Sequence, residues 1–240
     1  MYFQAAKIQK TILSSSHFPC VHFGKKCIFA RENENRAKMK SNKTQEVIRQ
    51  VAVDLFQKFG FEKTSMDEIA RRAHKAKRSI YNHFSNKEAL FSDAVKKELE
   101  NIRSQLQQVV NDDAQLILPR LKQYLLLRVQ LLANAKTLRV AMKSDMIRGD
   151  DYRFEELRDC FHSFSSWEYG LFKKVWMAKP TKDSVEVIEQ QSVAFADMLQ
   201  VTLNGLTHSF FVEEKYEQYK TSYEMLVNLI INSIFQTFQN

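Results

Sequence analysis

The sequence predicts an all-α protein, and three observations support this prediction. The 240 residues include only 5 Gly and 3 Pro, which is sparse for a chain rich in strands or loops. Hydrophobic residues make up 44% and aromatic residues 12%, so the chain can bury a sizeable core. After residue 40, apolar residues recur at three- and four-residue steps, the spacing of one helical face. We therefore expect a small helical domain near the N-terminus and a larger one after it.

Residues 1–40 do not show this order. The stretch HFPCVHFGKKCIFA has no helical period, and RENENRAKMK is a polar run of charges. We expect residues 1–40 to be a disordered basic extension. One interpretation is a flexible arm that follows a polyanion. The other, which we favour, is that the true start lies at Met39 and that residues 1–38 are absent from the natural protein.

Membrane and metal-binding classes find little support in the sequence. No apolar run reaches the roughly 18 residues that a membrane-spanning helix needs, and the first residues lack the order of a signal peptide. We therefore expect a cytoplasmic protein with no membrane partner. Cys20 and Cys27, with His17 and His22, fit no standard zinc spacing, and Cys160 stands alone. We predict no metal and no cofactor.

The first predicted helix of the small domain begins at Thr44. Its buried stripe consists of Ile48, Ala52, Leu55, Phe56 and Phe59. Gly60 can adopt the positive φ that commonly ends a helix.

Three more helices are expected between residues 64 and 108. Thr64 or Ser65 caps a second helix that runs to about His74, and a short third helix spans residues 77–84. The sequence SNKE forms a capping box in which Ser85 begins the fourth helix. The fourth helix is long enough to connect two domains.

A basic run joins the second and third predicted helices. It contains no acid between residues 71 and 78 and consists of Arg71, Arg72, Lys75, Lys77 and Arg78. The net charge is +6 over residues 1–40, +4 over residues 41–108 and −2 over residues 109–240. A compact helix pair with a basic edge is what a DNA-binding helix-turn-helix requires. Double-stranded DNA is therefore the expected partner of the N-terminal half.

Residues 44–90 resemble the DNA-binding domain of the TetR family of bacterial repressors. The resemblance rests on AVDLFQKFGFEKTSMDEIARRA followed by SIYNHFSNKEALF. It implies a helix-turn-helix domain at residues 41–90 and a helical effector-binding and dimerisation domain at residues 91–240, with residues 91–108 as connector. The sequence departs from the family in its turn, where His74, Lys75 and Ala76 replace the usual Gly, apolar residue and small hydroxyl cap.

The candidate DNA-binding residues fall into two groups. Four lie in the first turn and a half of the short helix and are suited to base edges: Lys77, Arg78, Ser79 and Asn82. The others are expected near phosphates, the last three of them by the family resemblance: Thr64, Ser65, Lys75, Tyr81, His83 and Lys87. The alternatives are that the basic residues form a solvated face and that Tyr81 and His83 are packing residues.

The second domain is expected to contain five helices at about residues 116–133, 138–148, 154–178, 183–212 and 216–238. The resemblance implies that the last two helices of each protomer form the four-helix core of a homodimer. Their apolar stripes would equally suit an internal core; they consist of Val193, Leu199, Leu203 and Leu206, and of Tyr223, Leu226, Ile230, Ile234 and Phe238.

An apolar cavity for a small molecule is a further expectation for this domain. Its candidate lining residues are Met142, Met146, Phe161, Phe164, Trp167, Phe172, Trp176, Phe195 and His208. Each of them could instead be an ordinary core residue. No nucleophile, base and orienting acid occur in a catalytic pattern, so an enzyme is not expected.

The predicted function is that of a transcriptional regulator. The resemblance implies a repressor that binds a palindromic operator as a homodimer and is released by an apolar or amphipathic effector. The alternative is a non-specific nucleic-acid-binding protein without an effector response, and a third, less favoured, class is a small-molecule enzyme on the helical domain.

Overall fold

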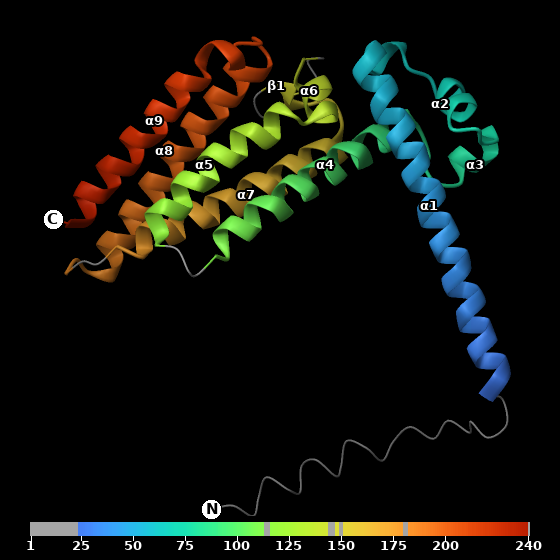
Figure 1. The fold of residues 1–240 in the computed structure, drawn as a ribbon, viewed down its shortest axis with the longest axis horizontal. Helices are drawn as coiled ribbons and strands as arrows, with labels where there is room; N and C mark the ends of the chain where they lie inside the picture. The colour runs from blue at the N-terminus through green and yellow to red at the C-terminus, as the bar shows by residue number, and fades with distance from the viewer. Residues whose placement is uncertain (1–23, 113–115, 144–146, 149–150, 180–181, 240) are drawn as a thin grey trace, which may run out of the picture. The chain divides into compact units, whose positions relative to one another are not determined.

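The structure is a computed structural model that describes residues 24–112, 116–143, 147–148, 151–179 and 182–239 (Figure 1). Its contacts divide the chain into two compact units, Met1–Gln45 and Glu46–Asn240. Helix α1, Gly24–Lys63, begins in the first unit and continues into the second. All the other helices and strands belong to the second unit.

Helix α1 begins earlier than expected. The sequence predicts a first helix from Thr44 and an irregular extension before it, whereas residues 24–43 are helical. The run RENENRAKMK has no apolar stripe, but Arg, Glu, Ala, Lys and Met are all favourable in helices. Residues 1–23, and with them Cys20, His17 and His22, lie outside the described residues.

Two short helices follow α1 as predicted, α2 (Met66–Arg72) and α3 (Lys77–Tyr81). Their small core is built from fully buried side chains of α1, α2 and α3, namely Ile48, Ala52, Leu55, Phe56, Ile69 and Ile80. Phe59 was expected in the buried stripe but is exposed, and its ring lies beneath the cations of Lys58 and Arg72.

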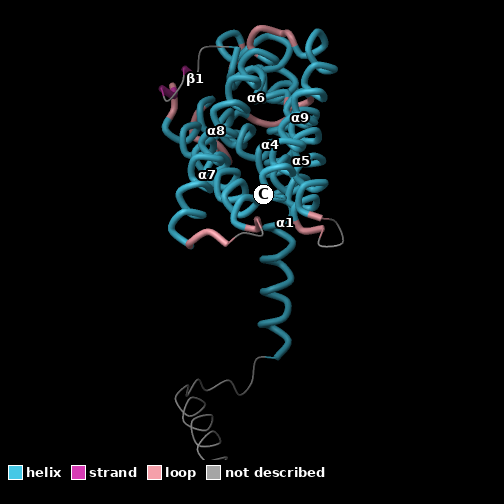
Figure 2. Tube along the Cα trace, turned by 90° about the vertical axis from the view of Figure 1, so that its left-hand side faces the viewer, coloured by secondary structure: helices cyan, strands magenta, loops and turns pink. Residues whose placement is uncertain are grey.

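The remaining helices form a bundle. They are α4 (Lys87–Val110), α5 (Ile117–Ala133), α6 (Lys136–Lys143), α7 (Glu155–Met177), α8 (Val185–Phe211) and α9 (Tyr216–Gln239). In Figure 2, α7 and α8 lie on one side of the bundle and α5 and α9 on the other, with α4 between them. This arrangement confirms the all-α class.

Apart from the start of α1, the predicted helix boundaries agree with the observed ones within about three residues, except for the end of α6, and the cap of α4 is a different residue. The helix expected at residues 138–148 is shorter, because α6 ends at Lys143 and residues 147–148 (β1) pair antiparallel with residues 151–152 (β2). The breaking residues Gly149 and Asp150 lie outside the described residues. Asn86, not Ser85, caps α4, because the Asn86 side-chain oxygen accepts a hydrogen bond from the Ala89 amide at 2.7 Å.

Phe61 connects the small helices to the bundle. Its ring packs against Phe56 and Phe91 with centroid distances of 5.7 and 5.1 Å, and against Phe154 at 5.5 Å. Lys87 of α4 donates to the Phe61 carbonyl at 2.9 Å and covers the Phe61 ring at 4.2 Å. The end of α1 is therefore joined to the starts of α4 and α7.

Gly60 adopts φ 80° and ψ 167°, a backbone conformation that is almost restricted to glycine. We predict that Gly60→Ala lowers the free energy of unfolding by about 1–3 kcal/mol. Gly170→Ala is the matched control, since Gly170 lies inside α7 and an added Cβ meets no atom within 4 Å. This control should raise stability by about 0.5–1 kcal/mol. Urea unfolding of both variants tests the expectation, and equal effects would contradict it.

The stripes predicted for the last two helices point inward. Leu199, Leu203, Tyr223 and Ile234 are buried within the protomer. A second set of apolar side chains is exposed on these helices, including Met198 at 67% and Leu229 at 63%. Among the described residues, no helix is both long and apolar enough to cross a membrane.

Candidate functional site

The turn between α2 and α3 has an uncommon backbone conformation. Ser65 begins α2 and accepts the amide of Glu68 at 3.2 Å. After α2, His74 adopts φ 51°, in the left-handed region that favours glycine. Ala76 then begins α3 without a side-chain cap, as predicted. The missing cap and the positive φ both reduce the intrinsic stability of this turn.

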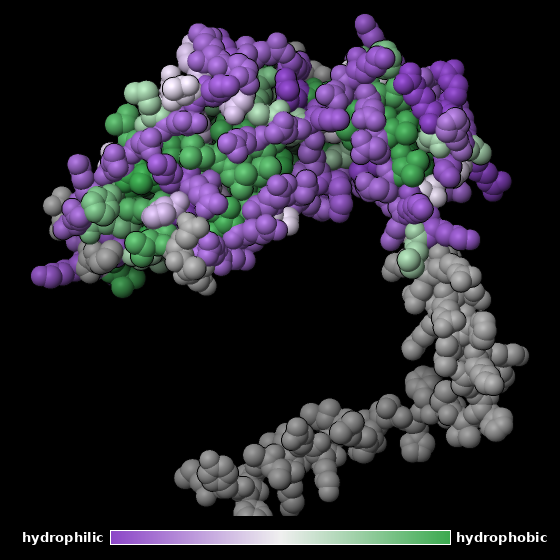
Figure 3. All heavy atoms as spheres, in the orientation of Figure 1, coloured by the Kyte–Doolittle hydropathy of each residue, from purple (hydrophilic) through white to green (hydrophobic). Residues whose placement is uncertain are grey.

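Helix α3 separates a buried face from an exposed face. Ile80 is fully buried and Phe84 nearly so, whereas Tyr81 is 45% exposed. Tyr81 is therefore not part of the small core, which argues against the alternative that it is a packing residue. Lys77, Arg78 and Asn82 are exposed as well, and hydrophilic atoms cover the region of α2 and α3 in Figure 3.

Ion pairs organise the cations around α3. Lys77 pairs with Asp67 of α2 at 2.7 Å, and this carboxylate raises the pKa of Lys77. Arg72 pairs with Glu68 at 2.8 Å, and Arg71 contacts the same carboxylate. Within the described part of the chain, Lys75 and Arg78 form no ion pair. These two exposed cations are thus the ones most available to a polyanion.

Three predicted contact residues have roles within the protein. Thr64 is buried. Its hydroxyl donates a hydrogen bond to the Gly60 carbonyl at 2.8 Å, and its backbone amide donates one to the Phe61 carbonyl at 3.3 Å. The Thr64 amide is therefore not free to bind an anion at the start of α2. The Ser65 hydroxyl caps α2 by accepting a hydrogen bond from the Glu68 amide. Lys87 holds the Phe61 carbonyl. Ser79 and His83 are half-buried at the edge of the small core.

The residues predicted to line one cavity do not gather in one place. Phe172 is buried and packs edge-on against Tyr124, while Trp176 packs against Phe195 and Phe238. These are core contacts. His208 is exposed near Glu213 at 4.0 Å. Met142, Phe161 and Trp167 are partly buried against the core, and Met146 lies outside the described residues.

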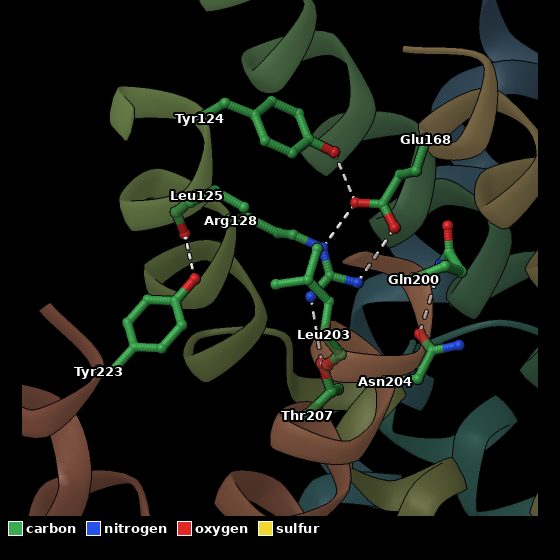
Figure 4. Close-up of polar contacts among 9 residues, drawn as sticks. All are labelled: Tyr124, Leu125, Arg128, Glu168, Gln200, Leu203, Asn204, Thr207 and Tyr223. Atoms are coloured by element: carbon green, nitrogen blue, oxygen red, sulfur yellow. Dashed lines mark hydrogen bonds and ion pairs between the residues drawn. The ribbon is translucent and has the colours of Figure 1, made fainter. Parts of the chain in front are cut away.

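A buried polar cluster lies inside the bundle (Figure 4). Arg128 of α5 donates to both carboxylate oxygens of Glu168 of α7, at 2.6 and 3.1 Å, and to Thr207 of α8 at 3.1 Å. Tyr124 donates to the same carboxylate at 2.5 Å. Burial disfavours the charged Arg128, but the adjacent Glu168 carboxylate outweighs it and raises the pKa of Arg128. Burial, reinforced by Glu168, raises the pKa of Tyr124.

Sequence reasoning missed this cluster, although a signal was present. Arg128 is the only charge within the apolar run LLLRVQLLA, and Glu168 lies in the aromatic run FSSWEYGLF. An ionisable residue in the middle of an apolar helix face is expected to have a buried partner. Searching for two such residues of opposite charge would have pointed to this pair.

A groove of about 540 Å³ lies between α4 and α7. Its α4 side includes Ser92, Asp93, Lys96 and Leu99, and its α7 side includes Glu156, Asp159, Cys160 and Phe164. Among the described residues predicted to line a cavity, Phe164 alone lines this groove. Burial raises the pKa of the Cys160 thiol, which makes it a poor nucleophile. A smaller apolar cavity of about 180 Å³ lies among α4, α5 and α7 beside Tyr124.

These features define a class of protein. A short helix that presents cations outward from a three-helix core, with a long helix leading into a helical bundle, is the architecture of a helix-turn-helix DNA-binding protein. Residues 48–94 match the family described as bacterial regulatory proteins, tetR family. The match covers the helix-turn-helix segment and the start of α4.

Solved structures share the fold over most of the chain. A transcriptional regulator of the TerR/AcrR family from Aquifex aeolicus is 20% identical, with a TM-score of 0.56, covering 78% of this chain and 99% of its own. NalD of Pseudomonas aeruginosa, the secondary repressor of a multidrug efflux pump, is 23% identical, with a TM-score of 0.56 and coverages of 81% and 96%. The SmeT–triclosan complex is 18% identical, with a TM-score of 0.60 and coverages of 80% and 91%. No curated protein sequence matches the chain.

Proposed function

We propose that this protein is a repressor that binds a palindromic DNA operator as a homodimer and is released by a small effector. The observation that carries the proposal is the exposed face of α3, where Lys77, Arg78 and Asn82 project away from the core that Ile80 and Phe84 secure. Arg and Lys donate to guanine acceptors in the major groove, and Asn pairs with adenine. Exposed Tyr81 and Lys75 are suited to the flanking phosphates.

The exposed apolar side chains of α8 and α9 support a homodimer. A single recognition helix reads only part of a helical turn of DNA, so proteins of this kind use two-fold dimers. Met198 and Val201 of α8 and Met225 and Leu229 of α9 are each more than 60% exposed. Packing these side chains against a second copy would remove apolar surface from water.

The contacts around Phe61 support coupling between an effector and DNA. Phe61 touches residues at the starts of both α4 and α7, and Arg49 of α1 donates to Asp93 of α4 at 2.6 Å. A ligand that favours a different placement of α4 would therefore shift the helices that bind DNA. This is ligand-selective stabilisation of a state that binds DNA poorly.

Selection of bound duplexes from a random pool tests the proposal directly. A palindromic sequence with two half-sites should be enriched, bound at least about 10³-fold more tightly than random duplex. Binding without enrichment would identify the alternative, a non-specific nucleic-acid-binding protein.

Two alanine variants separate base contacts from phosphate contacts. Asn82→Ala should cost about 1–3 kcal/mol on the selected operator and relax the preference at one base position. Lys75→Ala, which removes an exposed unpaired cation nearby, should weaken all duplexes alike and reduce the salt slope by about one. Lys75 is the better phosphate probe than Lys87, because Lys87 also holds the Phe61 carbonyl. Equal losses on all duplexes for Asn82→Ala would remove it from the base-reading set.

A further inference from the structure

The groove between α4 and α7 combines an apolar floor with a carboxylate-rich rim. Leu99 and Phe164 are buried beneath it. Four carboxylates and only two cationic side chains contribute to its lining. Its volume of about 540 Å³ lies in the range of small-molecule sites. The groove therefore suits a ligand with an apolar part and a positive charge.

Ser92 provides an independent indication of a ligand. This residue is 3% exposed and contributes to the groove lining, and its hydroxyl oxygen has no hydrogen-bond partner within the described structure. A buried hydroxyl without a partner is costly, so native proteins rarely leave one unpaired. A ligand that hydrogen-bonds to this oxygen would remove the cost.

The two ends of the groove differ in charge. Trp167 of α7 donates to Gln107 of α4 at 3.0 Å, and Cys160 lies one to two turns earlier on α7, near Lys96 and Asp93. Helices α4 and α7 therefore run in the same direction, as Figure 1 shows. Glu156, near the start of α7, thus lines the same end of the groove as Ser92 and Asp93 of α4. At the other end, the cation of Arg103 lies over the Trp167 ring at 5.1 Å.

The two cations that line the groove do not cancel this acidic end, although Arg158, outside the lining, pairs with Asp159 at 3.1 Å. Lys96 is exposed, and its long side chain can extend into water while its stem covers apolar surface. Glu156 forms no ion pair with another described residue. Asp93 is paired, but its partner is Arg49 of α1.

We propose that this groove binds an amphipathic amine whose ammonium group lies among Asp93, Glu156 and the Ser92 hydroxyl. The apolar part of the ligand covers Leu99 and Phe164. The ammonium group competes with Arg49 for Asp93, so binding loosens α1 from α4. This inference rests on the proposed function in one respect, since it assigns the effector class of the same regulator.

Direct binding of three probes with one alkyl chain tests the site. Decylammonium should bind below its micelle concentration, decyltrimethylammonium should bind more weakly because it lacks N–H donors, and decanoate should not bind. Isothermal titration with the full-length protein, without DNA, measures all three. Equal affinity for decylammonium and decanoate would overturn the proposal.

Variants locate the ammonium group. Glu156→Gln with Asp159→Asn removes two exposed charges from the rim and should weaken decylammonium at least about fivefold. Glu186→Gln with Glu217→Gln removes two exposed charges from α8 and α9 and should leave its affinity unchanged. Ser92→Ala should weaken decylammonium and not decyltrimethylammonium. An equal response of the two double variants would place the amine elsewhere.

The test of the amine site can fail or succeed independently of the test of the proposed regulator. If an operator is selected but decylammonium does not bind, the inference fails and the regulator stands. If decylammonium binds but no operator is selected, the site stands and the regulator fails.

Discussion

Glu168→Gln should lower the free energy of unfolding by about 3–5 kcal/mol, one of the largest effects expected for a single substitution in this protein. Arg128 is 5% exposed, and its guanidinium donates twice to the Glu168 carboxylate. Neutralising Glu168 leaves this buried cation without a counter-charge, and water cannot reach it to compensate. Tyr124 also loses the charged acceptor of its hydroxyl.

A double variant separates the cost of an unpaired charge from loss of packing. Arg128→Met with Glu168→Leu removes both charges and keeps apolar volume, so its stability should lie close to that of the original protein. Lys173→Gln is a control, since it removes a partly exposed cation of the same helix, α7, paired with Glu189 at 3.6 Å. Urea unfolding of the three variants measures these effects. A double variant less stable than Glu168→Gln would show that the pair itself is strongly stabilising.

The helices were predictable because their signals are local. The ends of α5, α7, α8 and α9 follow from apolar periodicity. In the structure Ser184 caps α8, because its hydroxyl accepts a hydrogen bond from the amide of Val187. The start of α1 at Gly24 was missed because residues 31–40 form a helix without an apolar face. Periodicity detects a buried face, and this segment of α1 has none in the sequence.

The candidate site was less predictable because it depends on which faces meet. The exposure of Lys77, Arg78 and Asn82 follows from the spacing of Ile80 and Phe84, and the structure agrees. Aromatic content alone could not separate a core from a cavity. Phe172 and Trp176 were candidates for a cavity or for the core, and they pack in the core. The groove is lined mainly by polar residues of α4 and α7 that no sequence pattern links.

The apolar stripe predicted for the last helix shows the same limit, because helical spacing does not say which surface the stripe packs against. Tyr223 and Ile234 satisfy the helical spacing, and they are buried against the protomer's own bundle, where Tyr223 donates to the Leu125 carbonyl at 2.8 Å. Helix α9 carries a second apolar set on its exposed side. Two apolar sets on one helix are expected where a helix packs on its own domain and on a partner.

If the protein is the proposed homodimer, Leu229→Glu should convert it to a monomer and reduce affinity for the selected operator at least about a thousandfold, to the level of non-specific binding. Leu229 is 63% exposed in the protomer, so the carboxylate remains in water and the fold is retained. In a dimer, two copies of this charge would be buried near each other without partners, which costs several kcal/mol. Sedimentation velocity measures the oligomeric state, and titration of the selected duplex measures affinity.

Gln218→Glu is the matched control, because it adds the same charge at an exposed polar position of α9. This variant should remain dimeric and bind the operator normally. The two variants should have equal helical content and similar melting temperatures. A dimeric Leu229→Glu variant would place the interface on another surface and would require a different explanation for the exposed apolar side chains of α8 and α9. A monomeric variant that still binds the operator tightly would show instead that one helix-turn-helix is enough for tight binding. Loss of the partner would then leave the DNA contacts of α3 unchanged.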